Sequence, residues 1–249
     1  MTELNPFEQL ENEDNLQKYK DAGAVATRAM NKIVKSVKPT KKLLDLSKQG
    51  NEYIKAELNT VQQNITDKGL VFPLCLSLNN VAGNNIVDDK DTTVLKEGDL
   101  LTIDFGVHID GFPAQISFTT LVTNSQEKFN DKRANVMKAV IEASREVAKN
   151  MKPGTLNTTI VKIMEECAKK YNCTLPLSSE SGLSPGVYSF QISRYTIDGR
   201  TDDEEDEQFI HRFILARENP MYDFSLQEMP LEEDEIYAID ICMCSGQGK

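Results

Sequence analysis

The chain has 249 residues, 39% of them hydrophobic, which is typical of a globular protein with one large domain or two smaller ones. Its formal net charge of −11 disfavours nonspecific nucleic-acid binding, so a polyanionic partner would need a local basic patch. No apolar run approaches the roughly 20 residues of a membrane span, the acidic N-terminal stretch is unlike a secretory signal, and five cysteines without framework spacing favour a reducing compartment.

Helical patterns come first along the chain, after a polar and acidic stretch, residues 1–14, that predicts a flexible N-terminus. Apolar residues three or four apart predict a helix over 14–37, which a Lys-Pro pair ends, and a second helix over 40–61. The apolar and β-prone stretch 69–78 then predicts a buried strand, and a loop rich in Asn and Asp follows it.

Residues 95–118 contain the strongest structural signal in the sequence. Apolar and polar residues alternate over 101–106, and Asp110-Gly111 is a typical two-residue turn, so we expect a hairpin of two paired strands. Asp104 places a carboxylate in the middle of the first of these strands. Its desolvation is costly unless the carboxylate is paired, hydrogen-bonded or bound to a metal.

The second part of the chain repeats the order of helices followed by strands. A helix is predicted over 130–151, where Pro-Gly follows, and Asn157 is predicted to be the N-cap of a fourth helix. Strands are predicted over 187–197, 209–215 and 236–244, and the acidic segment between the first two is expected to be a solvent-exposed loop.

Two pairs of segments recur along the chain in the same order. Residues 35–46 resemble residues 149–160 with a constant offset of 114, and residues 95–105 resemble residues 231–241 with an offset of 136. Two helix–helix–strand units explain both pairs, so the sequence predicts an internally duplicated α+β protein, with chance as the alternative.

The densest cluster of positive charge lies where the first two predicted helices meet. It contains Lys32, Lys35, Lys38, Lys41 and Lys42, which are candidates for contact with RNA phosphates. Lys32 and Lys35 also suit the C-terminal end of a helix dipole, so a structural role for them is the alternative.

Several kinds of active site find little support in the sequence. The chain has two histidines, His108 and His211, and neither position suits the base of a serine or cysteine triad. No phosphate-binding loop or dinucleotide fingerprint occurs. Asp104 and Asp240, on strands that match in the two repeats, remain as candidates for a two-metal site.

At these residues the sequence resembles a known family. TIDFGVHIDGF (102–112), preceded by FPLCLSLNN (72–80), is similar to the type 2 methionine aminopeptidases of the pita-bread fold. KPGTLNTT (152–159), IDG (197–199) and IYAIDICMCSGQGK (236–249) indicate a narrower group, the proliferation-associated or ErbB-binding proteins. The members of this group are relatives of the peptidases, and the resemblance implies that they associate with the ribosome.

The resemblance implies an α+β pita-bread fold in a single domain over residues 15–249. It implies pseudo-symmetric halves of about 15–123 and 124–249, in agreement with the repeats. Because the family continues past these residues with further core strands, the domain is expected to be incomplete at its C-terminus.

The peptidases of this family hold two metals with five ligands. The resemblance implies that this sequence keeps few of these five ligands. Asp104 matches the first ligand, whereas Asp240 replaces a Glu, Gln115 replaces the second Asp and Phe190 replaces the His. The second Glu is absent, and Asn84 takes the place of the substrate-side His. An amide is a weak ligand for a hard divalent cation and a phenyl ring is none, so we expect no catalytic residues, metal or cofactor.

The resemblance therefore implies a catalytically inactive protein that associates with the large ribosomal subunit and rRNA, in the cytoplasm and in the nucleus and nucleolus. Its role would lie in ribosome biogenesis or translation and in growth control. Two alternatives remain, namely an active metal-dependent methionine aminopeptidase and a protein-interaction scaffold without RNA contact, which the net charge of −11 favours. Nothing in the sequence indicates a membrane or DNA as partner.

Overall fold

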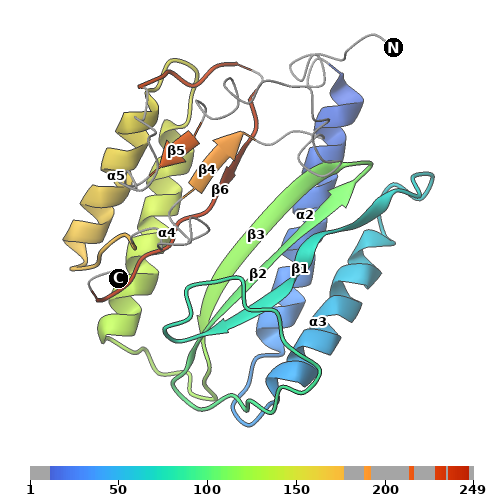
Figure 1. Ribbon diagram of the computed structural model, residues 1–249, viewed down its shortest axis with the longest axis vertical. Coiled ribbons are helices and arrows are strands. Elements are labelled where there is room, and N and C mark those ends of the chain that lie inside the picture. Colours follow the sequence, from blue (N-terminus) through green and yellow to red (C-terminus); the bar gives the residue numbers. More distant parts are fainter. Residues whose placement is uncertain (1–11, 177–187, 192–212, 216–227, 234, 247–249) are drawn as a thin grey trace. The chain divides into compact units, whose positions relative to one another are not determined.

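The chain forms two compact units of helices and strands (Figure 1). The boundary lies between Glu127 and Lys128, and we call the described residues before it unit 1 and those after it unit 2. None of the described helices has the length and apolar character needed to cross a membrane. The computed structural model describes residues 12–176, 188–191, 213–215, 228–233 and 235–246. The predicted flexible N-terminus lies almost entirely outside these residues.

Unit 1 consists of two helices packed against one face of an antiparallel sheet with strand order β1-β2-β3 (Figure 1). The first helix begins after Asn12, whose side chain accepts a hydrogen bond of 3.0 Å from the amide of Asp14. The elements of unit 1 are α2 (Glu13–Lys35), α3 (Leu43–Leu58), β1 (Lys68–Leu78), β2 (Leu100–Ile109) and β3 (Phe112–Leu121).

Along strand β2, successive side chains alternate between the two faces of the sheet, as predicted from the sequence. One face points toward the helices, and burial of each large side chain there contributes about 1.5–3 kcal/mol. Its fully buried residues are Leu101, Ile103, Phe105, Val107 and Ile109. The other face carries Thr102 and Asp104, which are half-buried. The side chain of Asp104 therefore points away from the helices.

The predicted hairpin is confirmed. Asp110 and Gly111 both have positive φ angles, 53° and 80°, as a type I′ turn requires, and Ile109 pairs with Phe112 across the turn. The Nζ atom of Lys18 lies 2.8 Å from the Asp110 carboxylate, so α2 holds the turn in place through an ion pair.

The second helix is shorter than predicted. It begins at Leu43 rather than at residue 40, because Thr40 has a left-handed backbone with φ 70° and Lys42 forms a β-bridge with Val94. Neither conformation continues a right-handed helix. The helix also ends earlier than predicted, at Leu58.

Unit 2 also combines two helices with a three-stranded antiparallel sheet, in the order β5-β4-β6. Small and apolar residues of both helices, such as Ala143, Val147, Ile160 and Met164, are fully buried in its core. The elements of unit 2 are α4 (Lys132–Asn150), α5 (Asn157–Lys170), β4 (Tyr188–Gln191), β5 (Phe213–Leu215) and β6 (Tyr237–Ile239). The predicted acidic loop lies outside the described residues.

Two predictions for unit 2 are wrong. Asn157 is not the N-cap of α5 but its first residue, and its buried side chain accepts a hydrogen bond of 3.1 Å from the amide of Met229. The last strand ends at Ile239 rather than at Cys244, which instead exchanges two backbone hydrogen bonds of 2.9 Å with Thr174.

The turn between α2 and α3 and the turn between α4 and α5 form hydrogen bonds at matching positions. These positions are separated by the same offsets, 114 and 136, as the repeated segments of the sequence. The amide of Thr40 donates to the carbonyl of Leu95, and the amide of Gly154 donates to that of Leu231, both over 2.8 Å. Thr40 and Gly154 share the left-handed conformation, with φ 70° and 85°. The predicted duplication is therefore visible in the structure as a repeat. Further bridges at matching positions join Lys42 to Val94 and Leu156 to Pro230.

Candidate functional site

The face of the sheet that points away from α2 and α3 brings four ligand-type side chains into two adjacent rows across the strands. Asp104 on β2 lies opposite Cys75 on β1 and opposite Ser117 on β3. Gln115 occupies the next position of β3 on the same face, opposite Gly106. The structure therefore places Asp104 and Gln115, two of the predicted ligand positions, on one sheet face.

Asp104 is held in a poorly solvated environment. The hydroxyl of Ser117 donates a 2.5 Å hydrogen bond to Oδ1, while Oδ2 is buried and has no hydrogen-bond partner among the described residues. Burial raises the pKa of the Asp104 carboxyl, and the hydrogen bond from Ser117 opposes this rise. Burial and the nearby Asp104 charge also raise the pKa of the Cys75 thiol to about 11, so Cys75 is not a thiolate nucleophile at neutral pH.

The other predicted positions provide no further group of metal ligands among the residues that the structure describes. Asn84 lies exposed in the loop after β1, with φ 58°, and Asp240 is exposed directly after β6. The backbone of Phe190 is in β4, where it pairs with Phe213 and Ala238.

The donor set does not fit the two metals of the peptidases. Among Asp104, Ser117 and Gln115, one carboxylate meets a hydroxyl and a neutral amide, which are weak partners for hard divalent cations. Within the described part of the chain, no three His, Cys, Asp or Glu side chains are grouped so that they would hold a metal ion. No catalytic step through a metal follows from these residues.

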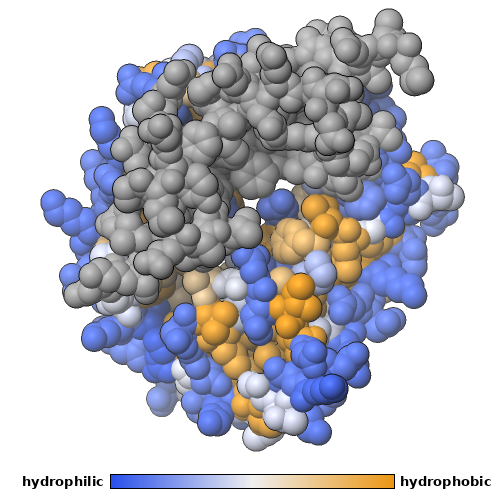
Figure 2. Space-filling model, viewed as in Figure 1, coloured by the Kyte–Doolittle hydropathy of each residue, from blue (hydrophilic) through white to orange (hydrophobic). Residues whose placement is uncertain are grey.

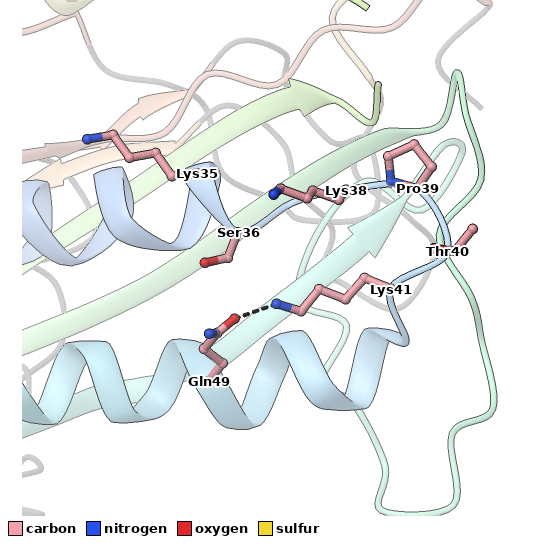
Figure 3. Close-up of a pocket in the computed structure, with 7 residues that line it drawn as sticks. All are labelled: Lys35, Ser36, Lys38, Pro39, Thr40, Lys41 and Gln49. Atoms are coloured by element: carbon pink, nitrogen blue, oxygen red, sulfur yellow. Dashed lines mark hydrogen bonds between the residues drawn. The ribbon is translucent and has the colours of Figure 1, made fainter. Parts of the chain in front are cut away.

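A second candidate site lies at the turn between α2 and α3. A hollow of about 400 Å³ opens there, and Figure 3 shows the side chains of Lys35, Lys38 and Lys41 extending from the turn in the same direction. We call this site the basic hollow. It is lined by Lys35, Ser36, Lys38, Pro39, Thr40, Lys41 and Gln49.

The five candidate lysines differ in their exposure, in their bonding partners and in whether they line the basic hollow. Lys41 is half-buried, and its ammonium group donates a hydrogen bond to the uncharged side chain of Gln49 (Figure 3). Lys35 and Lys38 are exposed, and neither forms an ion pair within the described residues. Lys42 is exposed but does not line the hollow.

Lys32 differs from the other candidate lysines because it has an acidic partner in the structure. Its Nζ atom lies 2.6 Å from one oxygen of the buried Glu57, and the Nε atom of Arg28 lies 2.6 Å from the other. The hydrogen bonds from these two side chains lower the pKa of Glu57, and the bond from Lys32 has the larger effect. Lys32 therefore neutralises a buried carboxylate. Sequence spacing missed this pair because Glu57 lies on another helix, although an acid among the inward-facing positions of α3 was a usable signal.

The chain belongs to metallopeptidase family M24, whose sequence profile matches residues 17–244. It is 30% identical over 235 residues to ErbB-3 binding protein 1 of Solanum tuberosum, covering 93% of this chain and 55% of that protein. It is 29% identical over 247 residues to proliferation-associated protein A of Dictyostelium discoideum, covering 98% and 58%. It is 28% identical over 241 residues to the curved DNA-binding protein of Schizosaccharomyces pombe, covering 95% and 58%. The chain thus spans little more than half the length of these relatives.

Solved structures confirm the predicted α+β pita-bread fold. A thermophilic Arx1 superposes with a TM-score of 0.72 at 18% identity, covering 94% of this chain and 63% of that chain. The methionine aminopeptidase of Rickettsia prowazekii superposes with a TM-score of 0.68 at 19% identity, covering 96% and 83%. Both likenesses concern the fold, and the single domain predicted over residues 15–249 stays a prediction.

Proposed function

We propose that this chain is a non-catalytic M24 protein that associates with the large ribosomal subunit by contacting rRNA phosphates. Its role would be in ribosome biogenesis or translation and in growth control, in the cytoplasm and in the nucleus and nucleolus. The observation that carries the proposal is the contrast between an M24 scaffold and the residues on its β2–β3 face, where Asp104 is accompanied by Ser117 and Gln115.

The chemistry of this donor set supports the proposed absence of catalysis. A two-metal peptidase needs several anionic ligands to hold both cations and to lower the pKa of a bound water toward neutrality. Gln115 brings no charge, so Asp104 is the one carboxylate of the pair. The pair therefore lacks the negative charge that two divalent cations require.

Contact with rRNA is supported by local charge and by the relatives. A protein of net charge −11 needs a concentrated basic site to approach a polyanion, and the basic hollow supplies one. The resemblance implies a ribosome-associated group, and one relative is named a curved DNA-binding protein, which agrees with a nucleic acid as partner.

A protein-interaction scaffold without RNA contact is the second candidate. The space-filling view shows hydrophobic side chains gathered over the strands of unit 1 (Figure 2). Val81, Ile86 and Phe118 are 43%, 61% and 42% exposed, and such side chains favour a protein partner. The relatives named ErbB-3 binding proteins agree with this candidate.

Co-sedimentation with purified large ribosomal subunits over a series of salt concentrations tests the proposal. We expect the chain to sediment with the subunits at low salt and to be released as salt rises, because each rRNA phosphate contact contributes about 0.7–0.9 to the log–log slope. Sedimentation that is independent of salt would favour the scaffold. Loss of sedimentation at every salt concentration would contradict ribosome association.

A further inference from the structure

The basic hollow collects positive charge that the fold itself does not neutralise. On the same helix α2, Arg28 and Lys32 each have an acidic partner, because both contact the carboxylate of Glu57. Lys35 and Lys38 have no such partner among the described residues, and none of the residues that line the hollow is acidic. Like charges held close together repel one another, so the hollow favours an anion.

The helix dipole does not explain this charge. It accounts for a cation in the last turn of α2, which ends at Lys35, because the effect is confined to that turn. Lys38 and Lys41 follow the helix, and the bond from Lys41 to the neutral Gln49 fixes a side chain without removing its charge.

The matching turn of unit 2 places similar lysines in a different charge environment. At the repeat offset of 114, Lys149 and Lys152 match Lys35 and Lys38, whereas Thr155 replaces Lys41. The Nζ atom of Lys149 lies 2.6 Å from Glu146. The hollow beside that turn is lined by three glutamates and one lysine. The same backbone arrangement therefore occurs with the opposite balance of charge.

We infer that the basic hollow binds a backbone phosphate of a nucleic acid, with Lys35, Lys38 and Lys41 supplying the positive charge. This inference rests on the proposed contact with rRNA and assigns it to one place in the fold. A phosphodiester fits because ammonium groups on flexible stems bind phosphate as point charges and need no base-specific geometry. RNA and DNA share this group, so both are tested.

The experiment compares the wild type with K35Q/K38Q/K41Q and with a control variant of equal charge. The control is K20Q/K55Q/K90Q, which removes three exposed lysines of unit 1 that do not line the hollow. Binding of labelled single-stranded RNA and of DNA of the same sequence is measured by fluorescence anisotropy over a salt series. Thermal unfolding of each variant is recorded alongside.

We expect K35Q/K38Q/K41Q to weaken RNA binding by roughly tenfold and to reduce the log–log salt slope by about 0.7 for each phosphate that the variant no longer binds. The control should weaken binding less than about twofold, since these lysines act on the RNA only through long-range charge. Equal weakening by both variants would overturn the inference, because net charge alone would then explain binding. Tighter binding of DNA than of RNA would keep the phosphate site but contradict its assignment to rRNA.

Ultraviolet crosslinking of RNA to the wild type gives a measure that does not depend on the folding of variants. Crosslinks are expected on the peptide spanning residues 35–49, and crosslinks confined to other peptides would overturn the inference.

Sedimentation with large subunits separates the two proposals. Equal sedimentation of wild type and K35Q/K38Q/K41Q would overturn the hollow alone, whereas RNA binding in the hollow without sedimentation would overturn ribosome association alone. A wild type that binds neither RNA nor subunits would overturn both.

Discussion

At the scale of single residues, two carboxylates of unit 1 respond to burial in opposite ways. Burial dominates at Asp104 and raises its pKa, because Ser117 is its one hydrogen-bond partner among the described residues. At Glu57 the hydrogen bonds from Lys32 and Arg28 outweigh the effect of burial and lower the pKa. Desolvation without a cation destabilises the charged form, and paired cations restore it. The two residues therefore make opposite contributions to stability as pH changes.

Asp104→Asn should increase the stability of the protein at pH 7 by about 1 kcal/mol, since it removes a buried anion and keeps an acceptor for Ser117. Because the folded state raises the pKa, ionisation of Asp104 costs stability above that pKa. The advantage of the variant should therefore shrink as pH falls through the folded pKa and vanish below the unfolded value of 3.8. Urea midpoints of both proteins across this range measure the effect, with Asp89→Asn as an exposed control. A variant that is less stable than the wild type at pH 7 would show that the anion is stabilised in the fold.

Glu57→Gln should have the opposite effect. At pH 7 we expect a loss of about 1–2 kcal/mol, below the cost of breaking a fully buried ion pair because Arg28 and Lys32 are half-exposed. The pKa of Glu57 is lowered on folding, so its contribution is present above 4.5 and is lost as pH falls through the folded pKa. The two proteins should therefore have the same urea midpoint in acid. Glu52→Gln, on the exposed side of α3, serves as control, and an equal loss in both variants would argue against the pair.

At the scale of elements, the repeated helix–helix turn tolerates different residues at its left-handed position. Thr40 occupies it in unit 1 and Gly154 in unit 2. A left-handed backbone costs a non-glycine residue about 1–2 kcal/mol, and more for a β-branched one. A Cβ atom at Gly154 would meet no atom within 4 Å, so a substitution there reports backbone strain without a steric clash.

Thr40→Gly is expected to stabilise the protein by about 0.5–1 kcal/mol, whereas Gly154→Thr should destabilise it by about 1–2 kcal/mol. The first value is smaller because glycine also gains entropy in the unfolded chain. Thermal midpoints of both variants give the two signs. Destabilisation by both changes would mean that the Thr40 side chain makes stabilising contacts that outweigh its strain.

The elements also show what a sequence can predict about this fold. Alternation over residues 101–106 and the Asp110-Gly111 pair predicted the hairpin because both signals are local. The start of α3 was missed because Thr40 is left-handed without being glycine. Asn157 was misplaced because its buried amide binds Met229, which is 72 residues away.

The candidate sites were predictable to different degrees. The sequence grouped five lysines by position, but Glu57, the ion-pair partner of Lys32, lies on the following helix, so spacing gave no sign of this pair. Gln49, which binds Lys41, was missed for the same reason. The pairing of Asp104 with Ser117 needed the strand register, which the hairpin turn fixes.

At the scale of the whole molecule, the chain belongs to a metallopeptidase family and has its fold. We propose that Gln115 and Phe190 stand at positions of anionic and imidazole ligands, and a peptidase reaction would need both cations to be held. The basic hollow gives a protein of net charge −11 a local site for an anion. The central claim is therefore that the fold is kept without the reaction.

Hydrolysis of a Met-Gly-containing peptide in the presence of excess Co²⁺ or Mn²⁺ tests this claim most directly. The wild type and the variant Q115D/F190H are compared with a blank that contains metal and peptide alone. We predict that neither protein exceeds the blank, because restoring two ligands does not restore the Glu positions or the groups that orient them. Turnover by the wild type at about 1 s⁻¹ or more, the range of ordinary enzymes, would contradict the account.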